Sequence, residues 1–273
     1  MTPYPNLIPE SLLINDTIAL LRSFGGKASA VSVVDFVMKI RKPDRQLARI
    51  LVADLIESDR RLSLNEDTVE LKDDEYESRE LSETEFVVFD LETTGAKAPP
   101  CRITEIGAYR VKNGEVKEAF QTLVNPETPI PPFISSLTGI CDEMVRDAPV
   151  FADVANDFLD FIGDSILVAH NSGFDMRFLN HEIGRVFGKY RLGNPCLCTV
   201  QLSRKLLPDI LNHKLKTVAK HYEIELVNHH RASADAYATA HIFVNLLAKL
   251  SENGVNDLAA VRGLGSRKHR YVR

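Results

Sequence analysis

Two carboxylates at the end of a strongly apolar segment constrain the fold of this chain more than any other feature. Residues 86–95 read FVVFDLETTG, a β-favouring run that carries Asp90 and Glu92 and stops at a glycine. Because side chains alternate between the faces of a strand, both acids point to one face, while Phe89 and Leu91 point to the other. A buried strand tolerates two neighbouring acids when a cation offsets their repulsion and their lost hydration. Oxygen ligands suit Mg²⁺ or Mn²⁺, so the segment predicts a strand ending in a metal-dependent catalytic site.

The bulk composition fits a folded protein from a reducing compartment. The 273-residue chain is 44% hydrophobic and 26% charged, which argues against disorder and allows a large core. It shows no apolar run long enough to span a bilayer and no signal-peptide pattern, so we expect a cytoplasmic location. The net charge of −5 gives no general attraction to nucleic acid, so any such contact must come from local patches. Four cysteines lack zinc-site spacing and fit reduced thiols: Cys101, Cys141, Cys196 and Cys198.

The chain divides at an acidic, polar stretch without apolar periodicity. Residues 73–84 contain this stretch and are expected to form a linker. They separate a small unit, residues 1–72, from a larger unit, residues 85–250. A C-terminal extension, residues 251–273, ends in a basic tail, which is either a solvated terminus or a local contact for nucleic acid.

The small unit is predicted to hold three helices followed by a β-hairpin. Asn15-Asp16 is the candidate cap of the first helix, and further helices are expected at about 32–42 and 44–58. Alternating residues between 61 and 71 predict the hairpin, and the whole order resembles a winged helix. Four cations lie where the third helix could present them to phosphates: Arg41, Lys42, Arg45 and Arg49. A solvated helix face and a protein-docking module are the alternatives.

The larger unit alternates strands and helices. Strands are predicted near 86–92, 103–112, 116–124 and 165–169, and helices near 150–163, 174–187, 199–207, 214–221 and 232–250. Strands that first follow one another directly and are later interleaved with helices predict a mixed α/β sheet flanked by helices.

Two further acids repeat the arrangement of the first strand. The apolar residues 166–169 lead into polar ones, and Asp175 then falls in the first turn of a helix, where ions bind. His229 and His230 precede an alanine-rich helix in which Asp235 lies about one turn from the start. The small residues there permit a close approach to a neighbouring strand.

The three segments FDLETTG, HNSGFD and HRASAD resemble, in order and separation, the motifs of the DEDDh 3′–5′ exonucleases of the ribonuclease H-like superfamily. This family includes the proofreading epsilon subunit of bacterial DNA polymerase III. The resemblance covers about residues 84–250, including LTGI at 137–140. It implies a ribonuclease H-like fold and an enzyme that removes nucleoside 5′-monophosphates from 3′ ends.

The resemblance also implies a catalytic set. Four acids would hold two Mg²⁺ or Mn²⁺ ions: Asp90, Glu92, Asp175 and Asp235. Asp90 would bridge the ions, Glu92 and Asp235 would complete one site, and Asp175 would hold the other. His230, five residues before Asp235, would be the general base, with His229 as an exposed neighbour. Two metal ions and a histidine that titrates near neutrality suit phosphodiester hydrolysis.

Substrate contacts are implied for seven more residues: Thr93, Thr94, Leu137, Ile140, His170, Asn171 and Phe174. Apolar wedging and stacking read shape and not sequence, as an enzyme that accepts every base requires. Core packing is the alternative for Leu137, Ile140 and Phe174. Glu105 also matches a family acid and is interpreted as a supporting or structural residue.

We therefore expect an exonuclease that acts on single-stranded or frayed DNA in proofreading, repair or end processing. An exoribonuclease is the nearest alternative, because the choice depends on contacts to the 2′-hydroxyl. A DNA-binding regulator or scaffold would be expected to show a broken acidic set, and this set is complete. The expected partners are nucleic-acid 3′ ends, DNA before RNA, and polymerase or repair proteins through residues 1–72, without a membrane.

Overall fold

The computed structural model describes residues 4–57, 59–72, 76–227 and 229–264 and divides the chain into two compact units. The first unit comprises Met1–Glu75 and Phe187–Gly193, and the second comprises Tyr76–Val186 and Asn194–Arg273. Within the described ranges, every helix is too short or too polar to cross a membrane.

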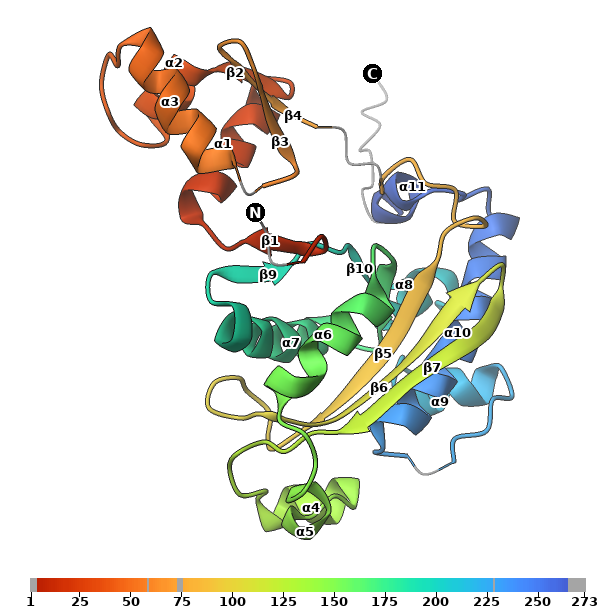
Figure 1. Cartoon of the computed structure of the whole chain (residues 1–273). Coiled ribbons are helices and arrows are strands. Elements are labelled where there is room, and N and C mark those ends of the chain that lie inside the picture. The colour runs from red at the N-terminus through yellow and green to blue at the C-terminus, as the bar shows by residue number, and fades with distance from the viewer. Residues whose placement is uncertain (1–3, 58, 73–75, 228, 265–273) are drawn as a thin grey trace. The chain divides into compact units, whose positions relative to one another are not determined.

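The first unit holds three helices and a small antiparallel sheet (Figure 1). Its elements are α1 (Leu12–Ser23), β2 (Lys27–Ser29), α2 (Ala30–Phe36), α3 (Arg45–Ile56), β3 (Leu62–Asn65) and β4 (Thr68–Leu71). The strand order is β2-β4-β3, and apolar residues of all three helices and the hairpin share one core. The three helices and the hairpin occur as expected, whereas β2 was not predicted because three residues show too little alternation. The winged-helix assignment remains a prediction.

Serine caps set the starts of the first two helices. Ser11 caps α1 by accepting a hydrogen bond from the Ile14 backbone, so the predicted cap at residues 15–16 is wrong. Ser29 caps α2 in the same way, three residues before the predicted opening. This helix ends at Phe36, earlier than expected, and Lys39 beyond it has a left-handed φ of 62°.

A segment from late in the sequence completes the first unit. Strand β1 (Leu7–Pro9) pairs antiparallel with β9 (Tyr190–Leu192). Leu7 and Leu192 are directly paired and both are buried. Neither strand was predicted, because each has only three residues and is stabilised by a partner far away in the sequence.

The second unit is built on a mixed five-stranded sheet. Its strands are β5 (Phe86–Thr93), β6 (Ile103–Lys112), β7 (Glu115–Leu123), β8 (Ile166–Ala169) and β10 (Cys196–Cys198), in the order β10-β8-β5-β6-β7. Strands β5, β6 and β7 are antiparallel neighbours, whereas β5, β8 and β10 run parallel. The predicted mixed α/β sheet is confirmed, with β10 as an additional edge strand.

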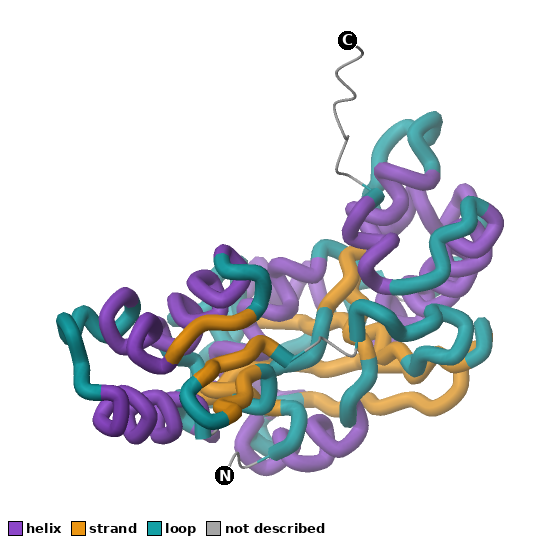
Figure 2. Tube along the Cα trace, turned by 90° about the horizontal axis from the view of Figure 1, so that it is seen from above, coloured by secondary structure: helices purple, strands orange, loops and turns teal. Residues whose placement is uncertain are grey.

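Helices cover both faces of this sheet (Figures 1 and 2). The helices of this unit are α4 (Pro132–Thr138), α5 (Asp142–Val145), α6 (Phe151–Ile162), α7 (Ser172–Phe187), α8 (Thr199–Leu206), α9 (Leu215–His221), α10 (Ala232–Glu252) and α11 (Leu258–Gly263). Phe158 of α6 packs against Phe120 of β7, with ring centroids 5.3 Å apart, while Phe243 of α10 packs against Phe86 of β5 at 4.9 Å. Phe120 shares a face with Phe89 through the strand register, so α6 and α10 lie on opposite faces.

The segments before and after the predicted large unit contribute to its core. Tyr76 and Leu81, which were expected to lie in the linker, are buried in the same cluster as Leu258 and Val261 of α11. The backbone of Leu81 also donates to Asn256. Residues 76–84 are therefore more ordered than a linker, because their few apolar side chains find partners near the C-terminus. Residues 73–75 and the basic tail at 267–273 lie outside the described residues.

Candidate active site

Strand β5 directs its two acids toward helix α10, as the sequence pattern predicts. Phe86 and Val88 have the same parity as Asp90, and both lie in the cluster that contains Phe243 of α10. Across the antiparallel pair, Asp90 is opposite Gly107 and Glu92 is opposite Glu105. The acids thus lie near the end of β5, on the face that α10 covers.

Gly107 allows the start of α10 to reach this strand pair. A Cβ atom at position 107 would lie 2.3 Å from the Ser233 nitrogen and 2.4 Å from the Ala232 carbonyl carbon. Only glycine fits such a close approach of two backbones. Since Asp235 lies in the first turn of α10, the contact at Gly107 brings that acid to Asp90.

Four acids from three elements converge at this point. One carboxylate oxygen from each of Asp90, Glu92 and Asp235 lies within 4.8 Å of the other two. Asp235 is only 5% exposed and Asp175, in the first turn of α7, only 2%. Asp175 is also the charged group that raises the pKa of Asp90 most. The structure therefore brings together the four acids that the sequence singled out.

Burial and mutual repulsion disfavour the ionised forms of these acids. Burial, then the charges of Asp175, Glu92 and Asp235, hold the pKa of Asp90 well above its usual range. Burial and the charge of Asp235 raise the pKa of Glu92 to about 8. Burial raises the pKa of Asp175 to about 7, although backbone hydrogen bonds at Asp175 and Leu91 oppose the shift. Such a cluster of oxygen atoms suits a hard divalent cation, which would stabilise the charged forms.

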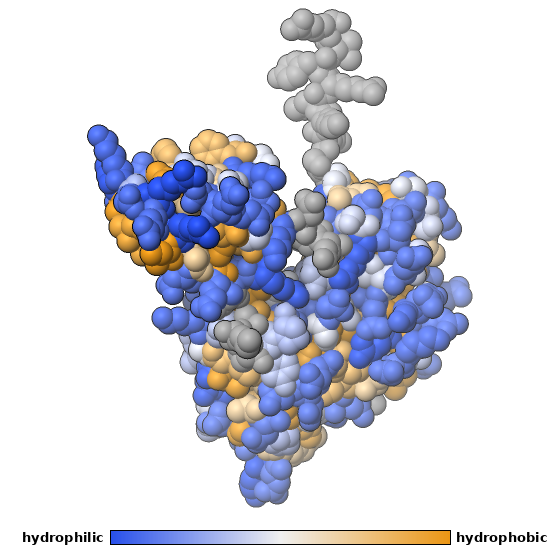
Figure 3. Space-filling model, turned by 45° about the horizontal axis from the view of Figure 1, so that its top comes forward, coloured by the Kyte–Doolittle hydropathy of each residue, from blue (hydrophilic) through white to orange (hydrophobic). Residues whose placement is uncertain are grey.

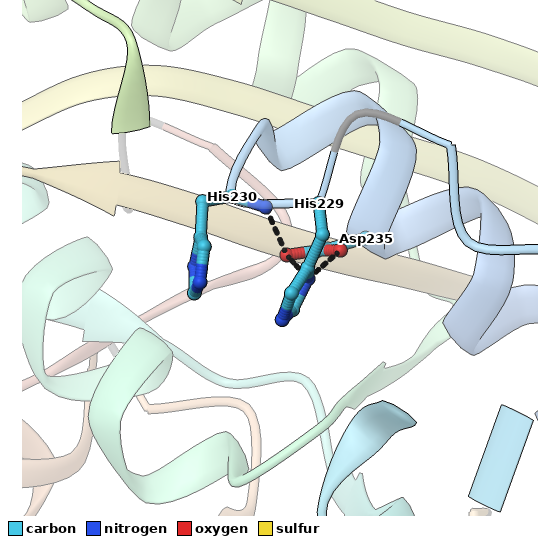
Figure 4. A group of neighbouring side chains, drawn as sticks. All are labelled: His229, His230 and Asp235. Atoms are coloured by element: carbon cyan, nitrogen blue, oxygen red, sulfur yellow. Dashed lines mark hydrogen bonds and ion pairs between the residues drawn. The ribbon is translucent and has the colours of Figure 1, made fainter. Parts of the chain in front are cut away.

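Two stacked histidines lie beside Asp235 (Figure 4). The ring centroids of His229 and His230 are 3.9 Å apart, and the two rings extend side by side from one loop. Nδ1 of His229 lies 2.7 and 3.0 Å from the two oxygens of Asp235, and the backbone N–H of His230 donates to the same carboxylate at 3.1 Å. Burial, followed by the charge of His229, lowers the pKa of His230.

His229 is a site residue that the sequence reasoning missed. It was expected to be an exposed neighbour, and its side chain is indeed 37% exposed, but it also contacts Asp235 directly. Its position beside His230 was the only clue in the sequence. The left-handed backbone at His230, with φ of 71°, lets both rings lie on the same side of the loop.

The residues after Glu92 are held by local hydrogen bonds. Thr93 donates through Oγ1 to the Gly95 carbonyl at 2.7 Å, and Thr94 accepts through Oγ1 from the Arg102 backbone at 3.0 Å. Arg102 in turn is paired with the buried Glu182 of α7. The turn that carries both threonines is therefore fixed on two sides.

The residues at the end of β8 form a second border of the site. Nδ1 of His170 lies 2.8 Å from Oγ1 of Thr199, and burial lowers the pKa of this histidine to about 4. Asn171 is exposed in a left-handed conformation, and half-buried Phe174 packs on Phe178 with ring centroids 4.9 Å apart. His170 is thus a neutral group near neutral pH, whereas Asn171 presents its amide to solvent.

The two residues expected to wedge against the last bases, Leu137 in α4 and Ile140 just after it, differ in exposure. Leu137 is 44% exposed, while Ile140 is fully buried in a cluster with Ile130 and Val145. The prediction that Ile140 contacts substrate does not agree with this burial, because its side chain is used for packing. Phe133, one helical turn before Leu137, is 75% exposed and was missed by the sequence reasoning.

Cationic side chains lie close to the histidine pair. Lys216 and Lys220 of α9 line a cavity of about 680 Å³ together with Leu226 and His229. The two lysines are four residues apart and so share one helix face. They had not been singled out, because only the fold brings α9 beside the loop that carries His229.

Comparisons with known proteins find exonucleases and DNA polymerases. The RNase_T family model, described as Exonuclease, matches residues 87–243. The chain is 43% identical over 188 residues to a PolC-type DNA polymerase III of Caldanaerobacter subterraneus subsp. tengcongensis. It is 44% identical over 177 residues to the PolC-type DNA polymerase III of Bacillus subtilis. These matches cover 69% and 65% of the chain but only 13% and 12% of the polymerases.

Solved structures share the fold of the second unit. Exonuclease X in complex with 5′-overhanging duplex DNA superposes with a TM-score of 0.52 and 26% identity, over 66% of this chain and 99% of that chain. Exonuclease I gives a TM-score of 0.54 at 20% identity, over 63% of this chain and 44% of that chain. A 3′-exonuclease that recognises a histone mRNA stem-loop gives 0.53 at 20% identity, over 64% of this chain and 84% of that chain.

Proposed function

The chain belongs to the RNase_T exonuclease family, and from this membership we propose that it is a two-metal-ion 3′–5′ exonuclease acting on single-stranded or frayed DNA ends. The observation that carries the proposal is the convergence of Asp90, Glu92 and Asp235 within 4.8 Å, with buried Asp175 beside them. A nuclease needs such a set of acids to hold its divalent cations near a phosphodiester.

The four acids would hold two Mg²⁺ or Mn²⁺ ions, with Asp90 shared between them, Glu92 and Asp235 at one and Asp175 at the other. The raised pKa values of Asp90, Glu92 and Asp175 support this assignment, because a bound cation would offset their repulsion. When bound, the ions supply charge neutralisation at the scissile phosphate and a lower pKa of the attacking water.

His230 is the proposed general base. Its lowered pKa keeps the imidazole unprotonated near neutral pH, so it can accept a proton from the attacking water. The hydrogen bond from its backbone to Asp235 holds it at the acidic cluster. His229 would orient the Asp235 carboxylate through its own contact at 2.7 Å.

The surrounding residues would position the 3′ end. Thr93 is the last residue of β5 and Thr94 follows it in the fixed turn. His170, Asn171 and Phe174 border the site between the end of β8 and the first turn of α7. On α4, exposed Leu137 and Phe133 would contact the last bases and replace the buried Ile140 in that role. On α9, Lys216 and Lys220 would attract phosphates. None of these contacts requires a particular base.

DNA is the proposed substrate, with nucleoside 5′-monophosphates as products, in proofreading, repair or end processing. The support comes from the DNA polymerases that match the chain at 43% and 44% identity and from the DNA complex of exonuclease X at 26%. An RNA substrate remains the second candidate. We place the enzyme in the cytoplasm, in line with its four free cysteines.

A degradation panel tests this proposal. The full chain would be incubated with labelled single-stranded, 3′-recessed and frayed DNA, and with matching RNA, in Mg²⁺, in Mn²⁺ and in EDTA. We expect stepwise shortening of DNA from the 3′ end, no activity in EDTA, and a loss of about 10²–10⁴-fold in His230→Ala, the usual contribution of a general base. Intact DNA in both metals, or faster degradation of RNA, would reject the proposed substrate.

The first unit is proposed to contact a protein or nucleic-acid partner. Figure 3 shows apolar surface exposed on this unit, and large exposed apolar residues include Phe36, Ile40, Leu47 and Ile50. On α3, exposed Arg45 and Arg49 accompany these apolar side chains. This mixed surface favours a polymerase or repair protein over DNA alone, since phosphate contacts need no apolar patch.

A further inference from the structure

Helix α10 has no side-chain cap of its own. Its N-cap residue is Arg231, whose side chain makes no capping hydrogen bond to the helix. The first backbone N–H groups of a helix have no partner within the helix and need an acceptor from elsewhere. The start of α10 matters because Asp235 lies in its first turn and His230 directly precedes the N-cap residue Arg231.

Glu105 of strand β6 supplies the missing acceptor. Its Oε2 accepts from the backbone N–H of Ala232 at 2.9 Å and from Nε of Arg231 at 3.1 Å. Its Oε1 accepts from Nη2 of Arg231 at 2.7 Å. Glu105 is 5% exposed, so the hydrogen bond from Ala232 is buried, while the two from the partly exposed Arg231 are half-buried. All three involve the carboxylate group and are of the charge-assisted kind.

The strand register links this contact to the acidic cluster. Glu105 is the direct partner of Glu92 in the β5–β6 pair, and Gly107, two residues on, touches the first turn of α10. Within the described residues, Glu105 is not one of the three carboxylates that lie within 4.8 Å of one another. Its charge acts directly on Asp90 and Glu92, whereas its hydrogen bonds act on the cluster through Arg231 and Ala232.

We propose that Glu105 is a positioning residue: its carboxylate caps α10 from the neighbouring strand and so fixes Asp235 and His230 against Asp90 and Glu92. The inference rests on the proposed metal-binding role of those acids. Without the three hydrogen bonds, the start of α10 would be held by the close packing at Gly107 and by the hydrogen bonds of Ser233 with Tyr109 and Gln121. Loss of a group that orients a metal ligand typically costs about 10–100-fold in metal affinity or activity.

Three variants of the full chain test the role. Glu105→Ala removes both carboxylate oxygens that accept hydrogen bonds from Arg231 and Ala232. Glu105→Gln keeps an oxygen for Ala232 and for Nε of Arg231. The matched control is Glu85→Ala, which breaks a pair with Arg110 at the opposite end of the same two strands, where Glu85 also accepts from Ser165 at 3.2 Å. For each variant, electron paramagnetic resonance would measure the binding of Mn²⁺ alone. An assay on single-stranded DNA would give kcat and KM, and thermal denaturation in EDTA would give Tm.

We expect Glu105→Ala to lower both Mn²⁺ affinity and kcat by about 10–100-fold, with KM close to wild type. Glu105→Gln should recover most of this loss. Glu85→Ala should lower Tm and leave Mn²⁺ affinity unchanged. A Glu105→Ala chain with wild-type Mn²⁺ affinity, or a folded Glu105→Gln chain as impaired as Glu105→Ala, would overturn the positioning role.

Two further outcomes keep the test decisive. If Glu105→Ala does not fold, Arg231→Ala removes two of the three hydrogen bonds and leaves the one from Ala232. Lowered Mn²⁺ affinity in that variant supports the role, and unchanged affinity overturns it. A wild-type chain that binds no Mn²⁺ would reject the proposed metal site itself and the positioning role with it. Wild-type binding that no variant alters would reject the positioning role alone.

Discussion

Burial of the carboxylates of Asp90, Glu92 and Asp175 costs electrostatic free energy in the folded chain. All three have raised pKa values, and burial is the first cause in each case. Residues that serve only stability are not normally arranged in this way, because mutual repulsion between buried carboxylates opposes folding. Single-residue changes at these positions should therefore separate stability from activity.

Asp90→Asn should strongly reduce activity while preserving the fold. The amide keeps the size of the side chain and removes a buried charge that four other acids repel, so Tm in EDTA should equal or exceed that of wild type. Exonuclease activity should fall by about 10²–10³-fold, as for loss of a preorganised electrostatic group. Calorimetry and an oligonucleotide assay measure the two effects. Asp157→Asn, on the exposed face of α6, is the control that should change neither.

The stability of the chain in EDTA should fall as pH rises. The raised pKa values of Glu92, about 8, and Asp175, about 7, mean that the folded chain binds protons more tightly than the unfolded chain. The stabilisation is complete below about pH 4, where free carboxyl groups titrate, and is lost as pH rises through 7 and 8. Thermal denaturation from about pH 5 to 9 measures this slope.

Mg²⁺ should reverse this trend, because it binds the deprotonated carboxylates. The increase in Tm on adding Mg²⁺ should therefore be larger at about pH 8 than at about pH 5. Asp90→Asn should show a smaller increase at both values. An increase that is equal at the two pH values would contradict the assignment of these acids as metal ligands.

At the scale of elements, the site depends on how closely α10 packs on the β5–β6 pair. Gly107 provides the space, and Glu105 provides the acceptor for the first N–H of the helix. Asp235 then reaches the cluster from the first turn of α10, as Asp175 does from the first turn of α7. Two helix starts and one strand end thus place four acids together.

Gly107→Ala should displace the start of α10. The added methyl group would meet backbone atoms of Ala232 and Ser233 at about 2.3–2.5 Å, where no flexible side chain can yield. We expect a loss of about 1–3 kcal/mol in the free energy of unfolding, as for overpacking, and a larger fall in kcat than in stability. Gly184→Ala, inside α7 with no atom within 4 Å of the added Cβ, is the control. It should stabilise by about 0.5–1 kcal/mol.

At the scale of the whole molecule, the proposed catalytic residues all lie in one of the two units. The four proposed metal-binding acids and the His229–His230 pair belong to the second unit. The segment Phe187–Gly193 belongs to the first unit through the pairing of β9 with β1. A chain that lacks residues 1–75 would therefore leave β9 without its partner strand. Unpaired edges of this kind promote aggregation.

Removal of residues 1–75 should leave catalysis intact but reduce solubility. We expect kcat on a short oligonucleotide close to that of the full chain, because every proposed catalytic residue remains. Light scattering should show self-association. Tyr190→Lys in the truncated chain, which places a charge on the exposed edge, should reduce it. A truncated chain that is monomeric, folded and inactive would show that the first unit takes part in catalysis.

Much of the second unit could be predicted from local pattern. The strand at 103–112 was predicted to the residue, and the strand at 86–92 and the helix at 232–250 to within two residues, because their apolar periodicity is long and regular. The first unit was predicted less accurately. The capping hydrogen bonds of α1 and α2 come from serines about one turn before the expected starts, whereas α3 begins after Asp44, as expected.

The sequence by itself determined which side chains carry the chemistry: the alternation on β5 and the motif order singled out Asp90, Glu92, Asp175, Asp235 and His230. Only the tertiary structure decided how they are held. The contact of Gly107 with α10, the cap by Glu105, the approach of His229 to Asp235 and the burial of Ile140 join residues that are distant in sequence or separated by a turn. Periodicity and propensity act within a few residues, whereas close packing selects partners across the whole fold.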